Sequence, residues 1–318
     1  MQRAFIVHNP AARNAPPLER LRVAAGALRP AGWEVEVLST DDVGHASVLA
    51  REAAAAGAAV VFASGGDGTA NEVVNGLVGT ETALGVLRGG TGNVFAKEVG
   101  IARAPEAALR LLVEGERRRF DLGLAQGPLV LSLANDECES PPGRHFLLMA
   151  GVGFDAKVVR RVPAGPKRLL GTASYVLWGL RELARYRPSQ ARLRVDGRER
   201  DVDLFWLLLG NTRSYGGVID ITSRALADDR RLDAYVFAGR GLGWTLSTGL
   251  RIALGRQDGA RGVWFHRVHE LAVDTPGLPV QADGEYFGET PATFSVAPAA
   301  LTILVPKGRA ERLFSKPP

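Results

Sequence analysis

The stretch VVFASGGDGTANEVVN, residues 60–75, decides the fold of the chain. Its apolar, β-branched start at residues 60–62 predicts a buried strand, and the glycine-rich turn at 64–68 follows directly. From Thr69 onward the apolar residues recur at helical spacing. The stretch therefore predicts a strand, a tight turn and the start of a helix.

The chemistry of this turn suits phosphate. Glycines let backbone amides approach a ligand closely, and the free N–H groups at a helix start favour an anion. An acidic residue in such a turn would repel phosphate directly. Asp67 is therefore consistent with a divalent cation, or water held by one, between its carboxylate and the phosphates.

A second stretch, ALGVLRGGTGNVF at residues 83–95, repeats this layout. An apolar strand precedes a glycine-rich turn that contains Thr91, and Asn93 stands at a predicted helix N-cap. A single turn of this kind is more often structural than ligand-binding. Two such turns in one parallel sheet would both emerge at the carboxyl ends of their strands, where open α/β sheets bind ligands.

The pair SGGDGTANEVVNGL and LGVLRGGTGNVFAKEVGI resembles the catalytic domain of the diacylglycerol kinase and sphingosine kinase family, in its soluble bacterial lipid kinase branch. The resemblance extends from Phe5 to Pro306 through His8-Asn9-Pro10, MAGVGFDAKVV at 149–159 and QADGE at 281–285. GGDGT alone is shared with NAD kinases and phosphofructokinases, so the specificity comes from the set of motifs.

The expected architecture is an α/β N-terminal domain like that of NAD kinase and phosphofructokinase, followed by a mostly antiparallel β-sandwich. We place the nucleotide-binding domain at 1–120, the β-rich acceptor domain at 121–306, and a tail that packs back on the first domain at 307–318. The sequence indicates the change from an α/β domain to a β-rich one, because short apolar runs recur between turns after Arg117. The helices expected outside the glycine-rich stretches are 16–28, 43–56, 105–114, 167–186 and 241–254. The strands expected after the change are 120–125, 129–134, 145–152, 191–195, 202–209, 232–237, 270–273, 292–296 and 301–305.

Two local features belong to the predicted β domain. Asp196-Gly197 lies between two strand-like runs and predicts a hairpin with a primed turn. Residues 135–144, NDECESPPGR, predict an exposed loop.

The resemblance implies which residues bind the nucleotide. It places ATP on the loop after the first strand and on both glycine-rich turns. The usual Ser or Gly after the Asn-Pro pair is replaced here by Ala12 and Arg13. On local grounds Thr40 is also a candidate cap residue. The implied set is Asn9, Pro10, Thr40, Gly65, Gly66, Asp67, Gly68, Thr69, Glu72, Thr91 and Asn93.

The late acidic motif supplies the candidate base. A carboxylate pair around a glycine is usually a solvated turn, but the family places this motif facing the nucleotide. Phosphorylation of a lipid hydroxyl needs a proton acceptor within hydrogen-bond reach of the attacking oxygen. We assign Glu285 to this role with Asp283 as the close rival, because both side chains share a face in an extended segment. Asp67 completes the catalytic set.

A structural Mg²⁺ is implied by the stretch ALADDRRLD, residues 225–233. The resemblance gives Asp229 as the side-chain ligand and the backbone carbonyls of Leu226 and Arg231 as the others. Carboxylate and carbonyl oxygens suit a hard cation. The family commonly has glycine where this chain has Arg230, and a solvated turn is the alternative.

Composition excludes several other classes. The 318 residues carry a net charge of +5 and one cysteine, Cys138, so the chain has no internal disulfide and no thiolate cluster. No apolar run approaches the roughly 20 residues that span a bilayer, and the N-terminus shows no signal-peptide pattern. We expect a cytoplasmic protein. No zinc-finger spacing or ribonucleoprotein motif is present, so nucleic acid is not an expected partner.

The sequence thus predicts an ATP- and Mg²⁺-dependent kinase for diacylglycerol or a related lipid taken from the membrane surface. A basic rim on an apolar segment at 157–187 is either a packed helix or a peripheral contact with the inner membrane surface. A homodimer is compatible with the sequence. The alternatives are an NAD kinase-like enzyme, and a nucleotide-binding regulatory protein without turnover. The second is suggested by Arg88, Val94 and Arg230, where the family more often has Pro, Asp and Gly.

Overall fold

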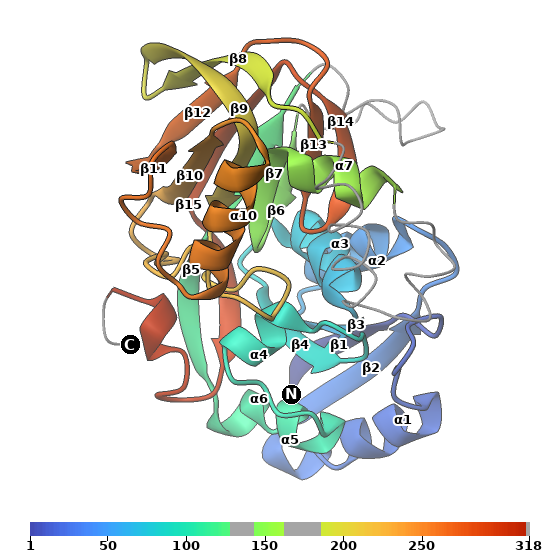
Figure 1. The fold of residues 1–318 in the computed structure, drawn as a ribbon. Helices are drawn as coiled ribbons and strands as arrows, with labels where there is room; N and C mark the ends of the chain where they lie inside the picture. The colour runs from blue at the N-terminus through green and yellow to red at the C-terminus, as the bar shows by residue number, and fades with distance from the viewer. Residues whose placement is uncertain (128–142, 162–185, 316–318) are drawn as a thin grey trace. The chain divides into compact units, whose positions relative to one another are not determined.

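A computed structural model describes residues 1–127, 143–161 and 186–315, and divides the chain into two compact units (Figure 1). The first unit comprises 1–122, 227–229 and 298–318, and the second 123–226 and 230–297. The expected strand at 129–134 and nearly all of the expected helix at 167–186 and loop at 135–144 lie outside the described residues.

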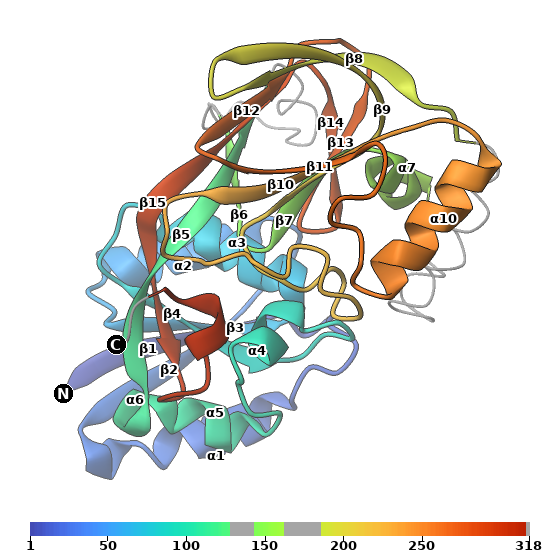
Figure 2. The same cartoon turned by 60° about the vertical axis from the view of Figure 1, so that its left-hand side comes forward.

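The first unit is built on a parallel sheet with the order β4-β3-β1-β2. This arrangement confirms the predicted α/β domain. Helices α1 and α5 pack together, as do α2 and α3, and α3 contacts β3 and β4 (Figures 1 and 2). Its elements are β1 (Gln2–His8), α1 (Leu18–Gly26), η1 (Arg29–Ala31), β2 (Trp33–Ser39), α2 (His45–Ala55), β3 (Val60–Gly65), α3 (Asp67–Leu77), β4 (Ala83–Arg88), α4 (Val94–Glu98), α5 (Pro105–Leu109), α6 (Leu111–Glu114) and η3 (Glu311–Leu313).

The pattern of apolar residues explains the core of this unit. Every residue of β3 is buried, as a strand covered on both faces requires. The predicted inward face of α3 is also buried, with Val73, Val74 and Leu77 fully inaccessible to solvent. One expectation is wrong in detail, since the helix predicted over 105–114 is divided at Arg110 into α5 and α6.

The second unit is a β-sandwich, which confirms the predicted antiparallel domain (Figures 1 and 2). The predicted hairpin joins β8 to β9, and Asp196 and Gly197 have φ of 43° and 81°, as a primed turn requires. Its elements are β6 (Arg144–Phe146), β7 (Met149–Gly153), α7 (Phe154–Arg161), β8 (Ser189–Val195), β9 (Arg198–Gly210), β10 (Leu232–Ala238), α10 (Leu242–Ala253), β11 (Val263–Val268), β12 (Glu270–Val273), β13 (Pro279–Ala282) and β14 (Glu285–Glu289).

Two long strands, β5 (Glu116–Gln126) and β15 (Ala292–Val305), contribute residues to both units. The sequence predicts separate strands at 292–296 and 301–305, but β15 is one strand of 14 residues. Its first part pairs antiparallel with β12, and Thr302 and Ile303 pair parallel with β4. Residues 298–306, which we expected in the second domain, therefore belong to the first unit.

The segment after β15 also belongs to the first unit. The ring of Phe314 packs edge-on against Phe120 at 6.3 Å, and the guanidinium of Arg118 lies 4.2 Å from its centroid. The carbonyl of Leu313 accepts a hydrogen bond from the N–H of Ala227 at 2.8 Å. These contacts bring residues 227–229 and the C-terminal segment together. Across the described ranges no helix has the length and apolarity needed to cross a membrane.

Candidate functional site

The two glycine-rich turns of the first unit lie in contact. Parallel pairing of β3 and β4 places Gly65 beside Arg88, and the N–H of Gly89 donates to the carbonyl of Gly65 at 2.7 Å. A Cβ added to Gly90 would lie 2.5 Å from the Cα of Gly66, which is closer than side chains tolerate. Glycine is therefore required for the turns to approach each other, and the paired turns expose backbone amides side by side.

Asp67 occupies the first position of α3 and connects the two turns. Its Oδ1 accepts the N–H of Phe95 in the first turn of α4 at 3.3 Å. Desolvation raises the pKa of the Asp67 carboxyl, and the backbone N–H groups of Val94, Phe95 and Asn93 oppose that rise. The carboxylate of Asp67 thus accepts a free N–H group at the start of α4, a role that an N-cap side chain such as that of Asn93 usually has.

The Asn93 side chain does not cap α4. Its backbone is left-handed, with φ of 47°, and its amide exchanges two hydrogen bonds with Gly90: Oδ1 accepts the N–H at 2.9 Å and Nδ2 donates to the carbonyl at 2.6 Å. No cap hydrogen bond comes from its side chain. Asn93 therefore stands at the predicted N-cap position of α4, but its side-chain amide closes the second turn instead of capping the helix. Thr91, between these residues, is exposed.

The loop after β1 is tied to the first turn. The side-chain amide of Asn9 donates to Thr69 Oγ1 at 3.1 Å, and its Oδ1 accepts the N–H of Ala11 at 2.9 Å. Thr69 occupies the space where a Cβ on Gly65 would fall. Asn9 and Thr69, both predicted nucleotide residues, are thus brought together, while Pro10 beside them is exposed.

Two further predicted residues have visible structural roles. Thr40 is buried, and its N–H donates to the carbonyl of His8 at 2.9 Å, which extends the pairing of β1 with β2. The carboxylate of Glu72 accepts the N–H of Ala46 at 3.2 Å, in the first turn of α2. Glu72 therefore serves the start of α2 in the same way that Asp67 serves α4.

A cationic cavity adjoins the second turn. Its volume is about 730 Å³, and Arg88, Lys97 and Arg103 line it together with the polar residues Thr91 and Asn93. Its lining contains no carboxylate. The fourth cation of the lining, Arg20, is paired with Glu106 by a 2.6 Å contact. A cavity with this charge and this position favours a phosphorylated ligand.

Arg88 is a partly buried cation of this cavity. Its Nη2 donates to the carbonyl of Ala96 at 3.3 Å, while Nε is buried and without a hydrogen bond. Burial lowers the pKa of the Arg88 guanidinium, and the charge of Arg103 lowers it further. Two cations that repel each other beside a cavity are stabilised when an anion binds between them.

The two carboxylates of the acidic motif in the second unit, Asp283 and Glu285, have different surroundings. Asp283 has a left-handed backbone with φ of 49°. Its carboxylate accepts the N–H groups of Leu147, Leu148 and Met149 at 2.7, 2.8 and 3.0 Å. Asp283 therefore anchors the segment that leads into β7, and its oxygens are occupied by backbone donors.

Glu285 begins β14 and carries the other carboxylate. Its Oε2 lies 2.8 Å from Nη2 of Arg144 on β6, and the side chain remains partly exposed. One partner therefore orients this carboxylate, which leaves lone pairs for a further proton donor. The geometry favours Glu285 over Asp283 as the proton acceptor.

Sequence reasoning overlooked Asp155, a fully buried carboxyl at the start of α7. It accepts the N–H of Ala156 at 2.7 Å and the side-chain amide of Gln281 at 2.9 Å. Burial raises its pKa to about 7. Gln281 in turn accepts the N–H of Gly284 at 2.9 Å, so Asp155 supports the acidic turn. The aspartate in the motif MAGVGFDAK was the signal that could have indicated it.

The loop at 226–231 carries the residues that the sequence assigns to a structural Mg²⁺. Arg230 adopts φ of 62°, the left-handed conformation that glycine takes most readily. Arg230 thus already has the backbone conformation expected of the family's glycine, so its identity is no objection to the predicted ligands Leu226, Asp229 and Arg231. Asp228, the neighbouring carboxylate, is held by the N–H of Ser315 at 2.7 Å. Within the described ranges no group of three acidic, histidine or cysteine side chains could hold a metal ion, so carbonyl oxygens would have to complete such a site.

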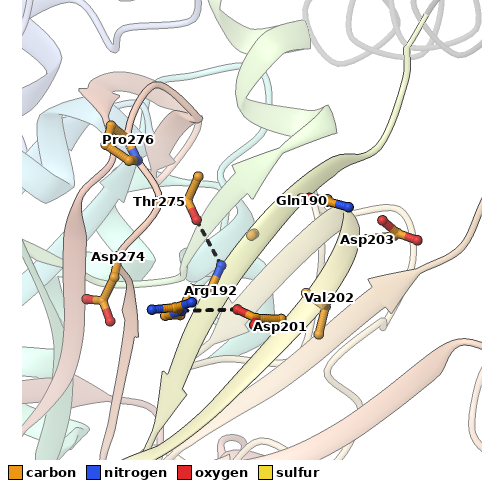
Figure 3. A pocket seen from close by; sticks show the side chains of 9 residues that line it. Gln190, Arg192, Asp201, Val202, Asp203, Asp274, Thr275 and Pro276 are labelled. Atoms are coloured by element: carbon orange, nitrogen blue, oxygen red, sulfur yellow. Dashed lines mark hydrogen bonds and ion pairs between the residues drawn. The ribbon is translucent and has the colours of Figure 1, made fainter.

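A cavity of about 720 Å³ at the β8–β9 hairpin is excluded as a cation site (Figure 3). Asp201, Asp203 and Asp274 line it, but arginines neutralise all three. Asp201 pairs with Arg192 at 3.1 Å, as Figure 3 shows. The other two pairs are Asp203 with Arg240 and Asp274 with Arg194.

Comparison with known proteins identifies the family. The diacylglycerol kinase catalytic domain matches residues 3–125, and the YegS C-terminal NAD kinase beta sandwich-like domain matches 149–305. A probable lipid kinase YegS-like protein of Pseudomonas aeruginosa is 34% identical over 99% of this chain and 97% of its own. The chain belongs to the bacterial YegS-like lipid kinase family.

Other relatives of this lipid kinase family agree. A protein of Mycobacterium tuberculosis named diacylglycerol kinase is 32% identical over 94% of both chains. The crystal structure of a putative diacylglycerol kinase from Bacillus anthracis superposes with a TM-score of 0.74 at 20% identity, covering 96% of this chain and 95% of that one. The last comparison supports the two-part fold.

Proposed function

We propose that the protein is an ATP-dependent lipid kinase that phosphorylates a hydroxyl of diacylglycerol or a related glycerolipid. One observation carries the proposal: the paired glycine turns lie directly beside a cationic cavity whose lining contains no carboxylate. The names of the relatives support a lipid acceptor and, for some of them, diacylglycerol.

The first unit supplies the binding of the phosphates. Backbone amides of the two turns donate to phosphate oxygens, and Thr69 and Thr91 add hydroxyl donors. Arg88, Lys97 and Arg103 neutralise the remaining charge from the cavity. Because charge accumulates on these oxygens in the transition state, fixed donors and cations lower the barrier to phosphoryl transfer.

Two roles are assigned to carboxylates. Glu285 accepts the proton of the lipid hydroxyl as the hydroxyl oxygen attacks the γ-phosphorus of ATP, whose bond to the β,γ-bridging oxygen breaks to release ADP. Asp283 and Asp155 hold the turn that carries Glu285. Asp67 stands at the paired turns, where its carboxylate would orient a Mg²⁺ bound with the phosphates. That ion would neutralise phosphate charge, and a second Mg²⁺ held by Asp229 would stabilise its loop.

The test uses purified full-length protein with γ-labelled ATP, Mg²⁺ and a panel of diacylglycerol, sphingosine and monoacylglycerol in detergent micelles. We expect labelled phosphatidic acid from the wild type and at least about a hundred-fold less from Asp67→Ala or Glu285→Gln. Val48→Gln, an exposed change on α2, is the matched control and should retain full turnover.

Three results would contradict the proposal. Full turnover in Asp67→Ala would remove the assigned role of that carboxylate. Formation of NADP from NAD and ATP would establish the NAD kinase-like alternative. Saturable ATP binding without transfer to any lipid of the panel would support a regulatory protein.

A further inference from the structure

Helix α10 of the second unit carries its apolar residues on the outside. Leu246, Leu250 and Leu254, the last of them at the C-cap, are 57%, 62% and 60% exposed. Their spacing of four residues places them on one face of the helix. The side chains that α10 buries include Thr245 and Thr248. A helix of a soluble unit normally shows the reverse distribution, so this face calls for an apolar partner.

The attachment of α10 leaves that face accessible. Trp244 in its first turn packs edge-on against Phe205 at 5.6 Å and donates its indole N–H to the carbonyl of Arg261 at 2.8 Å. No other described helix or strand packs extensively against α10. Figure 2 shows the helix at the margin of its unit.

The charged side chains of this helix and its flanks are basic, and one of them, Arg240, is paired with Asp203. Residues 240–257 contain Arg240, Arg251 and Arg256 and no acidic residue. A cavity of about 680 Å³ beside the helix is lined by Arg240, Arg251 and Arg261 together with Trp244. An apolar ridge flanked by arginines matches a surface that offers both hydrocarbon and negative charge.

We propose that α10 docks the protein on an anionic phospholipid bilayer, with the three leucines inserted at the headgroup boundary and lipid phosphates taken by the arginine-lined cavity. The inference deepens the proposed function, since a lipid kinase must meet its acceptor at a membrane. A second copy of the chain fits less well, because symmetric pairing of this face would bring its arginines together.

The test is co-sedimentation with sucrose-loaded vesicles of equal parts phosphatidylcholine and phosphatidylglycerol, against vesicles of phosphatidylcholine alone. We expect the wild type to bind the anionic vesicles and the triple variant L246Q/L250Q/L254Q to lose at least about ten-fold in affinity. Arg251→Gln should lose roughly five-fold on anionic vesicles and little on neutral ones, because each basic residue near such a surface adds attraction of that order.

The matched control is V23Q/V48Q/V113Q, three exposed valines on helices of the first unit. It removes a similar amount of exposed apolar surface and should leave vesicle binding unchanged. Equal losses in the two triple variants would overturn the inference, as would absence of binding by the wild type. Sedimentation velocity decides the remaining alternative: a wild-type dimer that L246Q/L250Q/L254Q converts to monomer would assign the face to self-association.

The result of the vesicle-binding test does not depend on whether the proposed reaction is right. Wild-type protein that binds anionic vesicles but transfers no phosphate to lipid would keep the membrane surface and reject the kinase. If the reaction is right, L246Q/L250Q/L254Q should keep its turnover on detergent-dispersed diacylglycerol and lose it on vesicles. Loss of turnover in detergent as well would show that the leucines serve something other than docking.

Discussion

Arg144 holds the carboxylate of Glu285 at 2.8 Å, in a turn whose neighbouring acid, Asp283, is bound to three backbone amides. The two acids therefore differ in what their loss would do. One carboxylate remains able to take a proton, and the other is part of the backbone framework.

We predict that Glu285→Gln lowers kcat by about a hundred-fold or more with little change in stability, because it removes a general base. Asp283→Asn should instead lower the free energy of unfolding by about 2 to 4 kcal/mol, since buried backbone donors lose a charged acceptor. Urea denaturation and steady-state kinetics on both variants measure the difference. The opposite pattern would make Asp283 the base.

Gly90→Ala should abolish nucleotide binding. The new methyl group would lie 2.5 Å from the Cα of Gly66, so the turns must separate. A loss of about 1 to 3 kcal/mol in stability is expected, as for other overpacked sites. Gly26→Ala is the control, because open space surrounds it. Isothermal titration with ATP gives the readout, and unchanged affinity in Gly90→Ala would reject the turns as the phosphate site.

Arg88→Met should weaken ATP binding without lowering the stability of the protein. Removing a partly buried cation that is repelled by Arg103 relieves desolvation and repulsion, so stability should be unchanged or higher by about 1 kcal/mol. The KM for ATP should rise roughly ten-fold, because a charge that faces the phosphates is lost. Arg51→Gln on the exposed surface of α2 serves as the comparison. An unchanged KM would place the phosphates away from this cavity.

Because burial raises the pKa of Asp155, we predict that the stability of the protein depends on pH. Its folded pKa of about 7 lies above the ordinary value of 3.8, so the folded state binds the extra proton between these values. Stability from this group is therefore greatest below pH 3.8, falls as pH rises toward about 7, and is constant above that. Between about pH 5 and pH 8 the loss should be about 2 to 3 kcal/mol.

Asp155→Asn keeps the size of the side chain and removes this titration. Urea denaturation at several pH values should show a shallower slope in the variant than in the wild type. Asp220→Asn, an exposed change, should leave the slope as it is. Identical slopes in Asp155→Asn and wild type would mean that Asp155 is ionised in the folded protein.

Mg²⁺ should raise the Tm of the wild type in the absence of nucleotide, because an ion bound only to the folded loop stabilises it. Asp229→Asn should remove most of this increase. Arg230→Gly should preserve it, since Arg230 already has the backbone conformation of glycine. Thermal unfolding with Mg²⁺ and with EDTA makes the comparison, and an equal shift in Asp229→Asn would refute the site.

The sequence predicts those parts of the fold that depend on local patterns. The apolar run before Ser64, the spacing of Val73, Val74 and Leu77, and the Asp196-Gly197 turn each specify a local structure, and each is found. The motifs also predicted part of the site, because they name both Asn9 and Thr69 as nucleotide-binding residues.

The features that the sequence could not predict depend on contacts between residues far apart in the chain. Nothing near Asp67 in the chain indicates that its carboxylate reaches Phe95, and nothing near Arg88 indicates a cavity shared with Arg103. The burial of Asp155 likewise depends on Gln281, which lies far along the chain. The exposed leucines of α10 have ordinary helical spacing, so their outward orientation cannot be read from the pattern.

The passage of β15 from one unit to the other affects how the gene can be divided. Residues 1–122 expressed alone would lack the strand end at Thr302 and Ile303, leaving β4 as an open edge that invites pairing with other chains. A chimaera that exchanges the catalytic part between relatives must therefore carry the last twenty or so residues of the same parent.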